Sequence, residues 1–144
     1  MYKHILLPTD GSDLSKVALK HGIAFAKSVG AEVTAMVVLT PLRSLVVDPN
    51  AVAKALEHYK ALVAEQTTRY LEHVRKDAEE AGVSCNVLCV EHDKPYEAIV
   101  DTARHSGCDL ILMASHGLRG VQALLGSETL KVLTNSSMPV LVYR

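Results

Sequence analysis

Cysteine is scarce in this sequence. The 144 residues contain only three cysteines, an odd number without the spacing of a metal site. Cys85 and Cys89 lie four residues apart in a predicted strand, so they share a face but are about 13 Å apart along it, too far for a disulfide. Cys108 is isolated. We interpret all three as small buried hydrophobic residues of a reducing compartment, with a redox sensor as the alternative.

Two further absences exclude whole classes of partner. The net charge is −1 and no block of Lys and Arg occurs, which argues against a nucleic-acid partner. The longest apolar runs span only a few residues, far short of a membrane span. Met1–His4 leads directly into an apolar run and leaves no room for a signal peptide. We therefore expect a cytoplasmic protein.

Catalytic constellations are also missing. None of the seven histidines belongs to an HExxH motif or to a cluster of His and Asp, so we expect no dedicated metal site. No Ser-His-Asp or Cys-His arrangement supports covalent catalysis. The sequence therefore offers no catalytic residue.

The chain does contain an alternation of two patterns. With 49% hydrophobic and 22% charged residues, it has the composition of one globular domain over residues 1–144. Five short, continuous apolar runs are typical of parallel strands that are buried on both faces. They are Ile5–Leu7, Val33–Leu39, Val87–Val90, Leu110–Ala114 and Val140–Val142.

Amphipathic helical patterns separate these runs. They cover Leu14–Val29, Val52–Ala78, Tyr96–Ala103 and Ser127–Asn135. The β-α-β-α-β-α-β-α-β order predicts an α/β fold, a three-layer, doubly wound parallel sheet of five strands with helices on both faces. Thr40–Asn50 is the one sizeable loop.

Ligands of such sheets bind beyond the carboxyl ends of the strands. Three segments fall there, Pro8–Ser12, Leu39–Pro41 and Ser115–Ser127. In the last of these, glycines allow close approach to an anion, and Gly126-Ser127 opens a helix whose free amides and dipole favour phosphate. Arg119 adds a charge. The alternative is that the glycines only shape the loop and Ser127 only caps the helix.

Two more residues are candidates at these strand ends. Asp10 suits a ribose hydroxyl or a metal carried by phosphates, or it caps the first helix together with Ser12 and Asp13. His116 touches phosphate or orients its loop.

Three segments in the same order carry a resemblance that covers essentially the whole chain. They are Ile5–Ser12, the pair Ser115-His116-Gly117 and Gly126-Ser127-Glu128, and Met138–Val142. On these residues the chain resembles the universal stress protein family of UspA-like domains. The resemblance implies an adenine nucleotide alpha hydrolase-like fold with sheet order 3-2-1-4-5.

The resemblance also implies a nucleotide and a dimer. The ligand would be ATP with Mg²⁺ carried by its phosphates, and the homodimer would form through the last strand, whose apolar edge pairing would cover. That strand is Val140, Leu141, Val142 and Tyr143. The nucleotide site that we predict comprises Pro8, Thr9, Asp10, Val38, Ala114, Ser115, His116, Gly117, Arg119, Gly126, Ser127 and Glu128. Val38 would meet adenine through its backbone.

The family motif for ATP binding, Gly-x2-Gly-x9-Gly-Ser/Thr, is matched with two departures. Ala114 replaces the first glycine, and eight residues instead of nine separate Gly117 from Gly126. We predict a stress-response regulatory or sensing module that binds ATP as a homodimer, has an unidentified protein partner and hydrolyses ATP slowly if at all. The alternatives are an interaction module that needs no nucleotide, a hydrolase or nucleotidyl transferase that depends on Asp10, and a binder of another adenosine nucleotide such as cyclic AMP.

Overall fold

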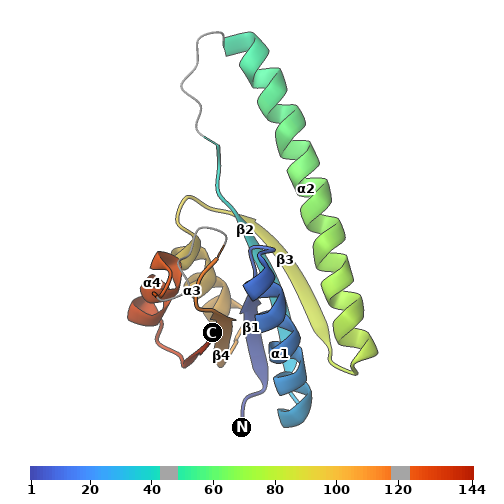
Figure 1. Ribbon diagram of the computed structural model, residues 1–144, viewed down its shortest axis with the longest axis vertical. Coiled ribbons are helices and arrows are strands. Elements are labelled where there is room, and N and C mark those ends of the chain that lie inside the picture. The colour runs from blue at the N-terminus through green and yellow to red at the C-terminus, as the bar shows by residue number, and fades with distance from the viewer. Residues whose placement is uncertain (43–48, 118–123) are drawn as a thin grey trace.

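The computed structural model of the protein describes residues 1–42, 49–117 and 124–144. Strands and helices alternate along these residues in the predicted order (Figure 1). The elements are β1 (His4–Pro8), α1 (Asp13–Val29), β2 (Glu32–Leu39), α2 (Pro49–Glu80), β3 (Cys85–Glu91), α3 (Pro95–His105), β4 (Leu110–Ala114), α4 (Ser127–Asn135) and β5 (Val140–Tyr143).

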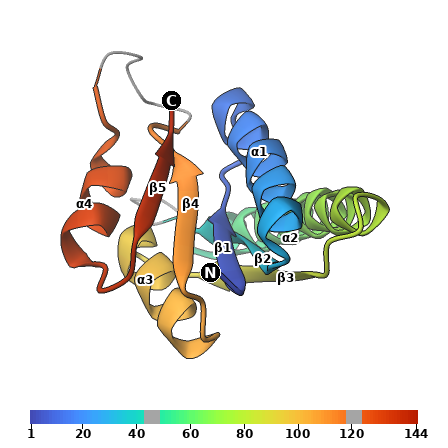
Figure 2. The ribbon, with the colours of Figure 1, turned by 90° about the horizontal axis from the view of Figure 1, so that it is seen from below.

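The strands form one parallel sheet of five strands in the order β3-β2-β1-β4-β5, which confirms the predicted topology. Helices α1 and α2 lie on one face, and α3 and α4 lie on the other (Figure 2). The chain order reverses direction in the sheet between β1 and β4. Their carboxyl ends therefore flank the position where parallel sheets of this kind bind ligands.

The central strand β1 shows why its apolar run is continuous. Ile5 and Leu7 belong to the core beneath α1 and α2, whereas Leu6 between them belongs to the core beneath α3 and α4. All three are at most 1% exposed. Because both faces of the strand are covered at these three positions, each of them must be apolar, and Ile5–Leu7 shows no polar alternation.

Helix α2 is the longest element, with 32 residues. Its buried residues, Leu71, Val74 and Ala78, lie toward the C-terminal end and pack on the sheet. The N-terminal half rises beyond the carboxyl ends of the strands (Figure 1), and there Tyr59 of the predicted apolar stripe is 51% exposed. The stripe is therefore longer than the part of the helix that the core covers.

The prediction of three buried cysteines is wrong for one of them. Cys85 and Cys108 are buried, but Cys89 is exposed, and all three are free thiols. Cys89 lies on β3, an edge strand whose outer part the helices do not cover. Within the described ranges, no helix combines the length and apolar composition that a membrane crossing requires.

Candidate functional site

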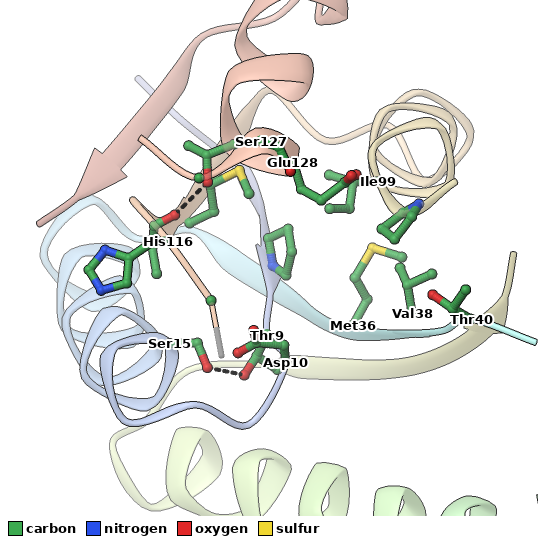
Figure 3. Close-up of a pocket in the computed structure, with 17 residues that line it drawn as sticks. Thr9, Asp10, Ser15, Met36, Val38, Thr40, Ile99, His116, Ser127 and Glu128 are labelled. Atoms are coloured by element: carbon green, nitrogen blue, oxygen red, sulfur yellow. Dashed lines mark hydrogen bonds between the residues drawn. The ribbon is translucent and has the colours of Figure 1, made fainter. Parts of the chain in front are cut away.

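A pocket of about 490 Å³ lies at the carboxyl ends of β1, β2 and β4, and the first turns of α3 and α4 complete it (Figure 3). Most of the predicted site residues line it, namely Pro8, Thr9, Asp10, Val38, Ala114, His116, Gly117, Gly126, Ser127 and Glu128. Ser115 is 3% exposed and borders a smaller neighbouring pocket instead. Arg119 lies outside the described residues.

Several lining residues were not predicted. They are Ser15, Met36, Pro95, Ile99, Met113 and Thr129, whereas Thr40, which also lines the pocket, lies in the predicted Leu39–Pro41 segment. Met36 lies two residues before Val38, so the two-residue period of a strand could have indicated it. Pro95 and Ile99 lie in the first two turns of α3, which reach the pocket only through the tertiary packing of that helix. Nothing local in the sequence indicates this.

The Pro8–Asp10 loop is fixed by backbone and side-chain bonds. The Thr9 N–H donates to the carbonyl of Met36 on β2 (2.9 Å), which holds the loop against the neighbouring strand. Asp10 Oδ1 accepts the Ser12 N–H at 2.9 Å, a turn that this residue type favours. Ser12 in turn caps α1, because its hydroxyl accepts the Ser15 N–H. The carboxylate of Asp10 thus shapes the loop and borders the pocket.

Gly117 lies against the carboxylate of Asp10. A Cβ built at Gly117 would lie 2.1 Å from Oδ2 of Asp10, so a side chain at this position would require the carboxylate to move. The constraint at Gly117 is steric and not conformational, because Gly117 is not among the described glycines with a positive φ. The Pro8–Asp10 loop and the segment Ser115–Gly117 are therefore packed on each other through Asp10 and Gly117.

Gly126 brings the start of α4 against the end of β4. Its N–H donates to the Ser115 carbonyl at 2.7 Å, and a Cβ at this position would lie 3.1 Å from the Cα of His116. The buried hydroxyl of Thr129 donates to the Ala114 carbonyl at 3.0 Å. These bonds place the first turn of α4 at the pocket.

The interpretation of Ser127 as the helix cap is wrong. Gly126 occupies the N-cap position with extended backbone, and Ser127 is the first helical residue, with an exposed side chain. The substitution of the motif's first glycine by Ala114 brings no strain, because Ala114 ends β4 and no described non-glycine residue has a positive φ.

Glu128 joins the first turns of two helices. Its Oε2 accepts the Tyr96 N–H at 2.9 Å, which satisfies an amide at the start of α3, and its Oε1 lies 3.2 Å from Lys131 Nζ. The carboxylate therefore serves α3 as well as bordering the pocket (Figure 3).

The opposite side of the pocket is apolar. Met36, Val38, Ile99 and Met113 supply it from β2, α3 and β4. The backbone of Val38 also faces the pocket, as the alternation of a parallel ladder shows. Met36 C=O accepts from Thr9 on the β1 side, and Leu39 C=O accepts from His92 on the β3 side. Val38 N–H and C=O therefore point to the β1 side, past the last β1–β2 pair, Pro8–Met36.

The charges of the pocket are acidic in the part of the chain that the structure describes. The lining residues there include the carboxylates of Asp10 and Glu128 and the imidazole of His116, but no Lys or Arg. His116 Nδ1 lies 3.1 Å from the Ser115 hydroxyl, its immediate neighbour.

Fold and pocket together define the class of protein. A five-stranded parallel sheet of order 3-2-1-4-5, with a pocket at the strand ends where the order reverses, is the adenine nucleotide alpha hydrolase-like fold.

The chain belongs to the universal stress protein family, whose sequence profile matches residues 1–144. It is 37% identical to universal stress protein MJ0531 of Methanocaldococcus jannaschii over all of this chain and 83% of that protein. The solved structure of MJ0577 from the same archaeon has a TM-score of 0.82 and 34% identity, and the match covers 99% of this chain and 95% of that one.

Two more distant family structures contain a ligand. One universal stress protein, with a TM-score of 0.68 and 24% identity over 99% of this chain and 97% of that one, was solved with cAMP. Another, from Archaeoglobus fulgidus, with a TM-score of 0.64 and 19% identity over 99% of this chain and 98% of that one, was solved with dAMP.

Proposed function

We propose that the protein is a regulatory or sensing module of the stress response that binds ATP with Mg²⁺ and hydrolyses it slowly if at all. The observation that carries this proposal is the composition of the pocket at the strand ends. An apolar wall with a backbone donor and acceptor lies at one end, and the N-terminus of α4 lies at the other.

The apolar end suits a purine, and the Val38 backbone suits adenine in particular. A backbone residue offers one donor and one acceptor. Adenine presents an acceptor at N1 and a donor at N6, which match the Val38 N–H and C=O. Guanine presents the reverse pair, a donor at N1 and an acceptor at O6. In the same orientation of the base, the Val38 backbone therefore pairs with adenine and not with guanine.

The start of α4 suits phosphate. The helix has nine residues, its first amides have no partner within the helix, and its dipole is positive at this end. Gly126 brings no side chain between these amides and the pocket. Two bonds hold them at the end of β4, from Gly126 N–H to the Ser115 carbonyl and from Thr129 to the Ala114 carbonyl. The eight-residue arm thus begins and ends at fixed points.

The acidic lining gives a reason for the metal. Asp10 and Glu128 repel the phosphates, and a divalent cation with oxygen ligands would offset this repulsion. Carboxylate oxygen is a donor that Mg²⁺ prefers, so the residues present fit this ion. Asp10, which borders the pocket at the end of β1, is the residue that would contact Mg²⁺ carried by the phosphates.

The comparisons support a nucleotide ligand. Relatives bind adenine nucleotides, cAMP in one structure and dAMP in another. We carry this over to the present chain as part of the proposal. A homodimer through β5 belongs to it as well, because β5 is an edge strand of the sheet and its Leu141 is 38% exposed.

Isothermal titration tests the proposal. ATP with Mg²⁺ should give heat of binding, the affinity should fall in EDTA, and GTP with Mg²⁺ should give no heat. Binding of cAMP or AMP with equal affinity in EDTA would instead favour a ligand with fewer phosphates. Absence of heat and of a thermal shift with all adenine nucleotides at millimolar concentration would refute the proposal. The result would then favour the nucleotide-independent interaction module.

A further inference from the structure

A tyrosine of the long helix α2 reaches the nucleotide loop. The hydroxyl of Tyr70 lies 2.8 Å from Oγ1 of Thr9, the residue that follows β1. Thr9 is 6% exposed, and its hydroxyl also lies 3.0 Å from Ser15 Oγ and accepts the Gly11 N–H at 3.3 Å. Tyr70 and Thr9 are separated by 61 residues in the sequence.

The direction of these hydrogen bonds follows from counting protons. Ser15 has one hydroxyl proton, which it donates to the Ser12 carbonyl at 2.9 Å. Ser15 must therefore accept from Thr9, and this uses the only hydroxyl proton of Thr9. The phenol of Tyr70 is left as the donor to Thr9. The chain of bonds runs in one direction, from α2 through the loop into the first turn of α1.

The surroundings keep this phenol protonated. Burial raises the pKa of Tyr70, and the negative charge of Asp10 contributes in the same direction. A neutral phenol is what the donor role requires.

Tyr70 lies where α2 leaves the body of the domain. The next residue, Leu71, is buried in the core, whereas none of the described side chains between Asn50 and Arg69 is buried. That part of the helix spans about 30 Å and stands on the side of the sheet where the strands end (Figure 1). Tyr70 is thus the point at which the projecting half of α2 is tied to the pocket.

We propose that Tyr70 is a positioning residue of the pocket: through Thr9 it holds the Pro8–Asp10 loop in place and couples nucleotide occupancy to the projecting half of α2. This inference rests on the proposed nucleotide binding. A ligand that contacts the loop should stabilise the Thr9–Tyr70 bond, and with it the α2 turns that precede Leu71. By the reciprocity of coupled equilibria, a partner that holds α2 in place should increase nucleotide affinity.

The test compares Tyr70→Phe with a matched control, Tyr59→Phe, which removes an exposed hydroxyl from the same helix. The phenylalanine ring keeps the packing and removes only the donor. We expect Tyr70→Phe to weaken ATP·Mg²⁺ binding about three- to tenfold, the effect of one neutral hydrogen bond, and Tyr59→Phe to leave it unchanged.

Hydrogen exchange provides the second measurement. In the wild type, ATP·Mg²⁺ should slow amide exchange both in residues 9–15 and in residues 60–70, and Tyr70→Phe should abolish the effect on residues 60–70 only. A lower melting temperature with unchanged affinity and unchanged exchange would show a merely structural role and overturn the inference.

Variants of Thr9 complete the design. Thr9→Val removes the acceptor of the Tyr70 bond together with the bonds to Ser15 and Gly11, so it should weaken binding at least as much as Tyr70→Phe, and the double variant should be no weaker than Thr9→Val. Thr9→Val also serves if Tyr70→Phe does not fold. Amide hydrogen exchange in the ligand-free protein separates the proposed nucleotide binding from the positioning role of Tyr70. If the wild type binds no nucleotide, the proposed function fails, and faster exchange of the Gly11 amide in Tyr70→Phe still decides whether Tyr70 positions the loop.

Discussion

The contact between Gly117 and Asp10 gives the sharpest test of the site geometry. In Gly117→Ala the new Cβ cannot coexist with Oδ2 of Asp10, which lies 2.1 Å from the ideal position. The carboxylate must turn away, and Oδ1 then loses the Ser12 N–H. Loss of that bond costs about 1 kcal/mol, and a strained rotamer adds about 0.5–1.5 kcal/mol.

A second effect has the opposite sign. Alanine restricts the unfolded chain more than glycine does, which stabilises the folded state by about 0.4–1 kcal/mol where the backbone is compatible. The backbone of Gly117 is compatible with alanine, because its φ is not positive. The net change in wild type should therefore be a loss of about 0.5–2 kcal/mol. In the Asp10→Ala background the clash is absent, and the same substitution should stabilise the protein by about 0.4–1 kcal/mol.

Urea unfolding of the four proteins of this double-mutant cycle measures the sign change directly. Asp10→Asn is the control for charge, because asparagine keeps both the acceptor and the steric bulk. Gly117→Ala should destabilise Asp10→Asn about as much as it destabilises the wild type. Equal effects of Gly117→Ala in the wild-type and Asp10→Ala backgrounds would refute the packing of the two loops on each other.

Three other predictions concern the core and the edges. Thr129→Val removes a buried donor to the carbonyl at the end of β4 and should lower the free energy of unfolding by about 1–2 kcal/mol in urea, whereas Thr134→Val, which removes an exposed bond of the same type, should change it little. Burial, with smaller effects from nearby carboxylates, raises the pKa of Cys108 from 9.0 to about 11. Between these two pKa values the folded protein retains a proton that the unfolded chain releases. The contribution of this thiol to the free energy of unfolding should therefore be fully present below pH 9 and decrease toward pH 11. The free energy of unfolding of Cys108→Ala should decrease less over this range. Leu141→Arg should convert the proposed dimer to a monomer in light scattering, whereas Leu88→Arg, equally exposed on the opposite edge strand, should not; a monomeric wild type would exclude the β5 dimer.

The fold could be predicted from the sequence because strands that are buried on both faces are continuously apolar, a pattern that is visible locally in the sequence. Leu110–Ala114 and Ser127–Asn135 were predicted with the bounds that the structure has. The strand ends that form the pocket follow from the same signature, since parallel strands end at one edge of the sheet. Glycines at close contacts, such as Gly117, are also visible in the sequence, although their partners are not.

What the sequence could not supply are bonds between distant segments. Tyr70 belongs to the apolar stripe of α2, but the helical spacing of that stripe does not indicate which strand end the Tyr70 hydroxyl contacts. Glu128 was predicted as a nucleotide residue from its position in the motif, and its bond to Tyr96, 32 residues away, depends on how α3 and α4 pack. The interpretation of Ser127 as a cap failed for a related reason. The contacts of Gly126 with the end of β4 fix where the helix starts.

The remaining step connects the pocket to the proposed dimer. The Ser115 N–H donates to the Tyr143 carbonyl at 2.7 Å, so the last residue of β5 is bonded to the turn that leads into Gly117. Ser115 also accepts the Gly126 N–H through its carbonyl. One peptide segment therefore contacts both the edge strand and the start of α4. If β5 pairs with a second copy, any shift of that strand displaces the phosphate end of the pocket, while Tyr70 acts on the opposite loop. Dimerisation and α2 would then influence nucleotide affinity through separate contacts, and their effects should be additive in variants that alter both.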